Sequence, residues 1–263
     1  MSTIAPHRTT DLLSTTFSAV SVLRQLPLII QWQFLRMSGH IALLVIIQIL
    51  LSVTTVLGYG LLVGIPSPEQ ALYLATGAST VTLIMVGLVM TPQMVTTSRT
   101  EGSLDWIRTL PVPRTIFLIA DLTIWTFIAL PGTALGVIAG AWKFDIDLSL
   151  SPWLPLAAIA VSLTSSCVGY AIACLCSPQI AQLMSQVLIF VLLFFSPVSY
   201  PASRLPTWLA EVHQWLPIEP MADAMRASLV SDVFTVSTRS VVVLSVWLVA
   251  SITGVSWALS RRI

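Results

Sequence analysis

The chain has 263 residues, of which 56% are hydrophobic and 9% are charged, whereas an ordinary soluble domain has about 25% charged residues. With a mean hydropathy of +0.91 it cannot cover a soluble globule with a charged shell, which excludes a soluble enzyme, a disordered protein and a disulfide scaffold. The composition indicates an integral membrane protein, and the net charge of +1 gives no electrostatic reason to expect a nucleic-acid partner.

The N-terminal region ends in an amphipathic segment, residues 22–38. Residues 1–16 are polar and lack the apolar core of a cleavable signal peptide. The later pattern predicts a helix along the inner membrane surface, with Pro27 in its first turn and Trp32 at interfacial depth. A soluble leader to the first span is the alternative. The apolar positions at helical spacing are Leu26, Ile30, Phe34 and Met37, and the polar positions elsewhere on the helical wheel are Arg24, Gln31 and Arg36.

Six apolar runs are long enough for helical spans, each of which needs about 20 residues. They cover residues 41–63, 72–94, 116–141, 153–176, 180–199 and 240–259. Only residues 177–179 separate the fourth run from the fifth, as a tight turn with a proline breaker. The runs are continuous rather than alternating, which argues against a β-barrel. The expected fold is therefore an all-α polytopic membrane protein with six transmembrane helices, forming one domain over residues 1–263.

The basic residues set the expected orientation, because cytoplasmic loops are enriched in arginine and lysine. With the N-terminus in the cytoplasm, eight arginines lie inside and four basic residues lie outside. Both termini are therefore expected in the cytoplasm, in a multi-pass protein of the cell inner (plasma) membrane. The inner set is Arg8, Arg24, Arg36, Arg99, Arg108, Arg114, Arg261 and Arg262, and the outer set is Lys143, Arg204, Arg226 and Arg239.

The largest expected cytoplasmic loop, residues 96–115, contains a short predicted helix. Ser103 can cap this helix and Pro111 ends it. An apolar ridge with an exposed tryptophan could dock on another protein, and a solvated linker is the alternative. The ridge consists of Leu104, Ile107 and Leu110, beside Trp106.

Residues 200–239 are too long for a turn and too broken by prolines for a span. Broken apolar helices at membrane depth are tolerated only where protein buries them or a cavity wets them. We expect a re-entrant helical hairpin dipping into the outer leaflet between spans five and six, and a periplasmic amphipathic cap is the alternative. The first apolar stripe is Trp208, Leu209, Val212, Trp215 and Leu216, and the second is Met221, Met225 and Leu229.

Glycines at a spacing of four residues form flat strips that let helices approach closely. One such strip lies in the third predicted span and a shorter one lies at the end of the first. We interpret both as helix packing rather than as a dimerisation signature. The strips are Gly132, Gly136 and Gly140, and Gly60 and Gly64.

Few side chains carry recognisable chemistry. Asp121, about 8 Å along the helix from Ile116, is the only acid well inside a predicted span. It is a functional candidate, but near the interface it could instead reach water or pair with Arg114. No catalytic constellation, metal-ligand spacing or cofactor motif is present. The single lysine, Lys143, lies outside any Walker loop, so ATP-driven work would require another polypeptide.

The combined pattern resembles the permease subunits of type-2 ABC exporters, six-span proteins that pair with separate ATP-binding subunits. The helix before span one is similar to the family's interface helix, and the loop from Arg99 to Arg114 resembles its R-x-x-G-T-L coupling-helix loop. Residues 195–209 and 216–226 resemble its outer re-entrant hairpin, which reads P-x-x-x-L-P-x-W-L and then N-P before a downstream arginine. The departures are Ser103 for threonine, Leu110-Pro111 for Thr-Pro, and Glu219 for the asparagine before Pro220.

This resemblance implies roles for two sets of residues. The ATPase-coupling set is Arg99, Glu101, Gly102, Ser103, Leu104, Asp105, Trp106, Ile107 and Arg108. The set in the outer hairpin, expected to line an apolar exit path, is Pro197, Trp208, Leu209, Trp215, Glu219, Pro220, Met221, Met225 and Arg226.

The resemblance also implies the partners and the activity. Two copies of an ABC ATP-binding subunit would hold ATP and Mg, and a second permease chain, identical or related, would complete the transporter within membrane lipid. The cargo would be a small lipophilic drug, an antibiotic or a lipid, moved outward. The alternative is a small ion-coupled secondary transporter. Such a transporter would need ionisable groups within the membrane, and Asp121 is the only acid well inside a predicted span.

Overall fold

The computed structural model describes residues 19–102 and 114–261. Within this part of the chain, six helical segments are long and apolar enough to cross a membrane, which confirms the predicted all-α polytopic fold. Predictions that concern residues 1–18, 103–113 and 262–263 lie outside it. The elements are α1 (Ala19–Val63), α2 (Pro68–Met85), η1 (Val86–Met90), α3 (Thr91–Thr100), α5 (Arg114–Phe144), α6 (Leu154–Leu175), α7 (Pro178–Phe190), η2 (Val191–Phe195), η3 (Ala202–Arg204), α8 (Thr207–His213), α9 (Ile218–Leu229) and α10 (Thr238–Arg261).

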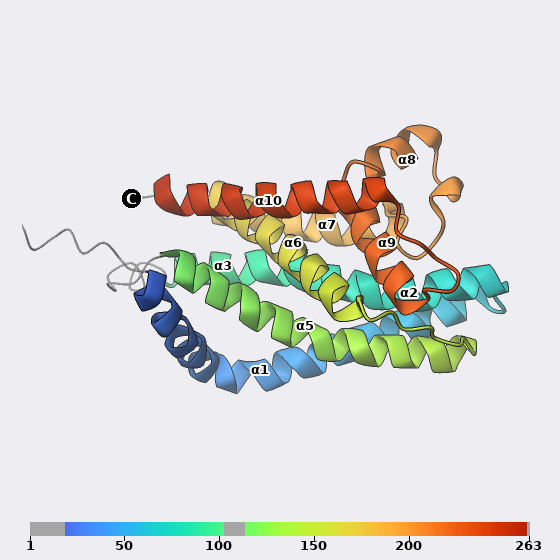
Figure 1. Ribbon diagram of the computed structural model, residues 1–263, viewed down its shortest axis with the longest axis horizontal. Helices are drawn as coiled ribbons and strands as arrows, with labels where there is room; N and C mark the ends of the chain where they lie inside the picture. The colour runs from blue at the N-terminus through green and yellow to red at the C-terminus, as the bar shows by residue number, and fades with distance from the viewer. Residues whose placement is uncertain (1–18, 103–113, 262–263) are drawn as a thin grey trace, which may run out of the picture.

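The long helices run side by side along the longest axis of the molecule (Figure 1). α5 packs along α1 and α2, and α10 packs along α6. One end of the bundle contains α3 and the end of α6, and we call it the Arg99 end; α8 and α9 lie toward the opposite end, the Arg226 end. The loop after α5 is tied to the last turn of α9, because the Ser151 N–H donates to the Ser228 carbonyl at 2.9 Å.

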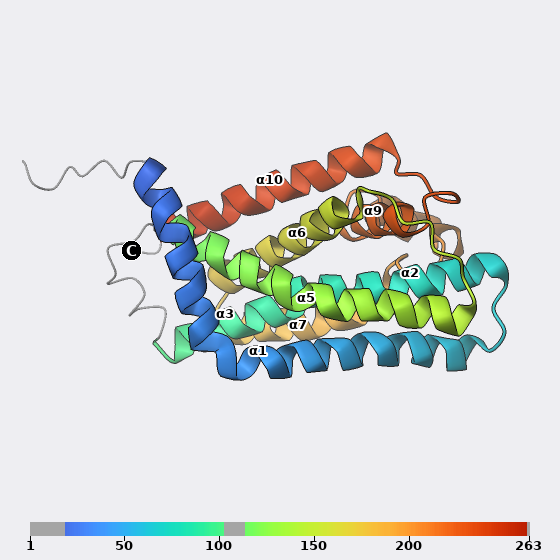
Figure 2. The same cartoon turned by 60° about the horizontal axis from the view of Figure 1, so that its bottom comes forward.

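α1 is one helix of 45 residues, whereas the sequence predicted an interfacial helix followed by a separate span. Figure 2 shows that its N-terminal part turns away from the axis of the rest and crosses the Arg99 end of the bundle. Ser38 ends the first predicted segment and Gly39 follows it, and Gly/Ser pairs let a helix bend without breaking. The predicted first-turn position of Pro27 is wrong, because the helix already begins at Ala19.

Residues 68–100 form one continuous helical rod made of α2, η1 and α3, about 50 Å long at 1.5 Å per residue. A capping box formed by Ser67 and Gln70 starts the rod. The predicted span ended at residue 94 and the predicted loop began at residue 96, but the helix extends to Thr100. Hydropathy marks the apolar part of a helix and not the point at which its backbone hydrogen bonds end, so the loop boundary was placed too early.

The π-helical turn η1 lies just before Pro92, which has no N–H to donate to the carbonyl four residues earlier. The wider turn accommodates this missing bond, and the Thr91 hydroxyl donates to the Val86 carbonyl at 3.1 Å. Gly87 in η1 faces Gly169 in α6, and a Cβ added to Gly169 would overlap the carbonyl oxygen of Gly87. The close approach of these two helices therefore depends on the absence of a side chain.

Gly169→Ala is expected to lower the free energy of unfolding by about 1–3 kcal/mol, because the added Cβ would meet backbone atoms rather than a movable side chain. Thermal unfolding of the purified protein in detergent would measure the change. Gly254→Ala in α10 is the matched control, since no atom of the described residues lies within 4 Å of its Cβ position and alanine favours helix. Equal midpoints for the two variants would contradict the close approach.

The glycine strip of the third predicted span packs as expected. A Cβ on Gly132 would lie 2.5 Å from Cγ of Gln48, and Gly136 faces the hydroxyl of Ser52 in the same helix, α1. The packing prediction is wrong for Gly64, which has a φ of +71° and no atom within 4 Å of its Cβ position. A glycine in this left-handed conformation just after a helix ends the helix, and here it ends α1.

Candidate functional site

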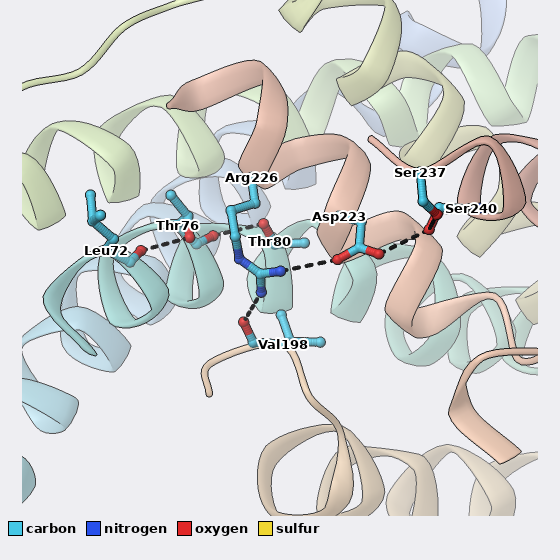
Figure 3. Close-up of polar contacts among 8 residues, drawn as sticks. All are labelled: Leu72, Thr76, Thr80, Val198, Asp223, Arg226, Ser237 and Ser240. Atoms are coloured by element: carbon cyan, nitrogen blue, oxygen red, sulfur yellow. Dashed lines mark hydrogen bonds and ion pairs between the residues drawn. The ribbon is translucent and has the colours of Figure 1, made fainter. Parts of the chain in front are cut away.

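Arg226 is buried in the last turn of α9, with 5% of its surface exposed. Its Nη1 donates to Oδ1 of Asp223 at 3.1 Å, one helical turn earlier, and its Nη2 donates to the Val198 carbonyl at 2.8 Å. Figure 3 shows the guanidinium between these two acceptors. A buried charge needs such partners, and the second bond ties α9 to the chain segment that follows η2.

Two aromatic rings cover the Arg226 guanidinium. Its Cζ lies 4.2 Å from the ring centroid of Tyr73 in α2 and 5.6 Å from that of Phe234. Burial lowers the pKa of Arg226, and the negative charge of Asp223 opposes this shift. Oδ2 of Asp223 also accepts a hydrogen bond from the Ser240 hydroxyl of α10 at 2.9 Å, as Figure 3 shows. One buried arginine thus joins α2, α9 and α10.

The nine residues predicted for the outer hairpin and the exit path differ widely in exposure. Met221 and Met225 lie in the core, 0% and 1% exposed, whereas Trp208 and Trp215 are 64% and 69% exposed. Helical spacing shows which residues share a face but not what covers that face, and the methionines are covered by the long helices. Of the others, Pro197, Pro220 and Arg226 are buried, and Leu209 and Glu219 are partly buried.

Glu219 is partly buried beside this cluster, and its Oε2 has no hydrogen-bond partner in the part of the chain that the structure describes. Burial raises the pKa of Glu219, and the charge of Asp223 raises it further. The folded protein therefore binds the Glu219 proton more tightly than the unfolded chain does. Stability contributed by the neutral form is complete below the usual glutamate pKa and is lost as the pH rises through the raised pKa.

We expect Glu219→Gln to raise the midpoint of thermal unfolding at about pH 7.5, where ionised Glu219 is penalised, and to leave it unchanged near pH 4. Glutamine resembles the neutral acid, so the midpoints of the variant and the parent protein should coincide at low pH. Glu211→Gln is the control, because Glu211 is exposed on α8. An equal gain at both pH values would show that the effect does not come from ionisation.

Arg99 lies in the last turn of α3 and reaches the C-terminal end of α6. Its Nη1 donates to the carbonyls of Ala173 and Cys176, the latter at 3.0 Å. The last carbonyls of a helix lack partners within the helix and carry partial negative charge, so a guanidinium satisfies both needs. The beginning of the predicted coupling segment is therefore fastened to α6.

Three of the nine predicted coupling residues are described, namely Arg99, Glu101 and Gly102; residues 103–108 fall in the undescribed segment. The Glu101 N–H donates to the Thr97 carbonyl at 2.9 Å and closes the last turn of α3. Gly102 has a φ of +74°, a left-handed conformation that favours glycine. The chain therefore leaves α3 through a turn that only glycine adopts without strain.

Asp121 lies in α5 at the Arg99 end, and its Oδ2 accepts a hydrogen bond from the Tyr170 hydroxyl of α6 at 3.0 Å. Water or Arg114 was one predicted partner for Asp121, and the Arg114 side chain lies outside the part of the chain that the structure describes. Tyr170 was missed because 49 residues separate it from Asp121 and no local pattern connects them. Tyr73, which stacks on Arg226, was missed for the same reason.

The chain matches one known family of membrane proteins. A family model described as ABC-2 type transporter matches residues 24–230, well over half of the chain, including α2 to α9 with Arg99 and Arg226. A search of curated proteins gives no match. The matched domain is the membrane-spanning permease component of type-2 ABC transporters, which works with an ATP-binding ABC subunit and does not itself contain the nucleotide-binding domain. The chain therefore belongs to the ABC-2 type transporter family, as a multi-pass permease subunit.

Proposed function

We propose that this permease is the transmembrane subunit of an ATP-driven exporter that moves a small lipophilic drug, an antibiotic or a lipid outward across the cell inner membrane. Two copies of an ABC ATP-binding subunit hold ATP and Mg, and a second permease chain, identical or related, completes the transporter. Both termini and the Arg99 end face the cytoplasm. Family membership and the arginine distribution support this arrangement.

The observation that carries the proposal is the anchoring of the α2–η1–α3 rod at both ends. At the Arg99 end, Arg99 bonds to the final carbonyls of α6. At the Arg226 end, Tyr73 of the rod stacks on Arg226 of α9. A rigid helix that is bonded to a different neighbour at each end can pass a movement of one neighbour to the other. A push on the loop after Gly102 would therefore move α6 and the rod together, and the rod would displace α9.

Exposed apolar side chains on α7 fit the proposed surroundings. Leu183 and Phe190 of α7 are 66% and 60% exposed. Together, α7 and η2 are long and apolar enough to span a membrane. Contiguous exposed apolar surface is covered by lipid or by another protein in a native membrane protein. Both membrane lipid and a second permease chain satisfy this requirement.

Arg99→Ala tests the coupling path. In proteoliposomes containing the permease and its ATP-binding subunit, we expect the variant to reduce permease-dependent stimulation of ATP hydrolysis about fivefold or more, because α3 is no longer fastened to α6. Arg204→Ala is the matched control, since Arg204 is exposed at the Arg226 end. Full stimulation in the Arg99 variant would contradict transmission through α3.

Co-purification with an ATP-binding subunit tests the broader proposal. An exporter of this kind continues to transport when the proton gradient is dissipated and ATP remains. An ion-coupled secondary transporter, the alternative, would stop under the same conditions. Transport that needs the gradient and no ATP-binding subunit would overturn the proposed function.

A further inference from the structure

A cavity of about 460 Å³ lies at the Arg99 end, between the N-terminal part of α1 and helices α3, α5 and α6. Its volume falls in the range of sites that bind small molecules. Apolar side chains on three helices line part of it: Met37 of α1, Val95 of α3 and Trp125 of α5. Val95 and Trp125 are 5% and 3% exposed, so they form a firm apolar wall.

Hydrogen-bond acceptors face this apolar wall. Asp121 lines the cavity, and the Tyr170 hydroxyl holds one of its carboxylate oxygens at 3.0 Å. Gln33 lines it from α1 with 4% of its surface exposed, and its Oε1 has no hydrogen-bond partner among the described residues. The carboxylate of Asp121 is the acceptor that the cavity offers to a positively charged hydrogen-bond donor.

The other charged side chains that line the cavity do not reverse its preference for a positively charged donor. Arg36 and Glu101 also line the cavity, both on exposed side chains and with opposite signs. The Arg36 guanidinium lies over the Trp32 ring, 5.5 Å from its centroid. The Arg36 charge also acts on Asp121 across the cavity. Because Arg36, Glu101 and Asp121 together carry a formal charge of −1, the lining as a whole still favours a cation.

We propose that this cavity binds the primary ammonium group of an amphipathic molecule, with the charge on Asp121 and the apolar part against Trp125 and Met37. The inference rests on the proposed function and names its substrate class. A free amphipathic amine and the headgroup of an ethanolamine lipid share this chemistry.

Binding to the purified permease, without its ATP-binding subunit, tests the inference separately from transport. The probe is radiolabelled dodecylammonium, measured on permease in phosphatidylcholine nanodiscs against empty nanodiscs. Dodecanol, which has no charge, should bind at least about tenfold more weakly. Nanodiscs that also contain phosphatidylethanolamine separate the two sources: reduced probe binding indicates the lipid headgroup, and unchanged binding indicates a free amine.

Asp121→Asn is expected to weaken dodecylammonium binding about tenfold or more, whereas Tyr170→Phe, which keeps the charge, should stay within about threefold of the parent. Glu69→Gln is the control, because Glu69 is an exposed acid at the start of α2, far along the rod from the cavity.

Unchanged binding in the folded Asp121 variant, or equal binding of dodecanol and dodecylammonium to the parent protein, would overturn the inference. The second comparison needs no substitution, so it decides the question even if Asp121→Asn fails to fold. A permease that binds the amine but shows no ATP-dependent transport would overturn the proposed function alone.

Discussion

Gly102→Pro is expected to reduce permease-dependent stimulation of ATP hydrolysis at least about tenfold while the chain still inserts in the membrane. Gly102 has a φ of +74° at the junction between α3 and the loop that follows. Proline holds φ near −65°, so the junction cannot keep its direction. Gly102→Ala should give a smaller loss, because an L-residue adopts the left-handed region at a cost of about 1–2 kcal/mol.

Gly64→Pro is the matched control for this variant. Gly64 has a φ of +71° just after α1, and among the described residues no atom lies within 4 Å of the Cβ position of either glycine. Both substitutions force a left-handed residue toward a φ near −65°, at different ends of the bundle. Gly64→Pro also removes the N–H that donates to the Gly60 carbonyl at 3.2 Å, so it is the more demanding test of general misfolding. Stimulation of ATP hydrolysis in reconstituted complexes should survive the change at Gly64. Equal losses in the two variants would indicate a general effect on folding and would refute a coupling role for the Gly102 junction.

Arg226→Ala is expected to lower the free energy of unfolding by roughly 3–5 kcal/mol, the range found when one partner of a buried ion pair is removed. The variant leaves Asp223 without its cation, the Val198 carbonyl without its donor, and the Tyr73 ring without its stacked group. Denaturant unfolding of the purified protein in detergent would measure the loss. Arg226→Lys should recover only part, since an ammonium group lacks the planar fork and the stacking face of a guanidinium.

Two further variants test whether the loss of stability comes from the buried Arg226 contacts or from removing any arginine. Arg239→Ala removes an exposed guanidinium that bonds to the Gln214 side chain at 2.8 Å, and it should change stability by less than about 1 kcal/mol. Combining Asp223→Asn with Arg226→Ala should destabilise by less than the sum of the single changes, because the two groups share one interaction. Additive effects would contradict a coupled pair.

The sequence by itself determined the fold class, because uninterrupted apolar runs of about 20 residues can bury their backbone polar groups in lipid only as helices. All six predicted runs lie within or overlap the six long helical segments of the structure. The absence of a Walker loop meant only that ATP-driven work would require another polypeptide, and the permease prediction came from the resemblance of the loop and the hairpin to a known family. Local chemistry predicted the tight turn before α7, where Pro178 begins the helix.

Only the tertiary structure decided which residues act together. Arg226 and Tyr73, or Asp121 and Tyr170, lie far apart in the chain, and hydropathy says nothing about which helix faces which. Tertiary packing likewise placed the hairpin methionines in the core. Gly64 ends a helix through its backbone conformation, which no spacing pattern reports. Apolar burial in lipid is a property of each segment alone, whereas a buried charge is stable only with partners that the whole fold brings to it.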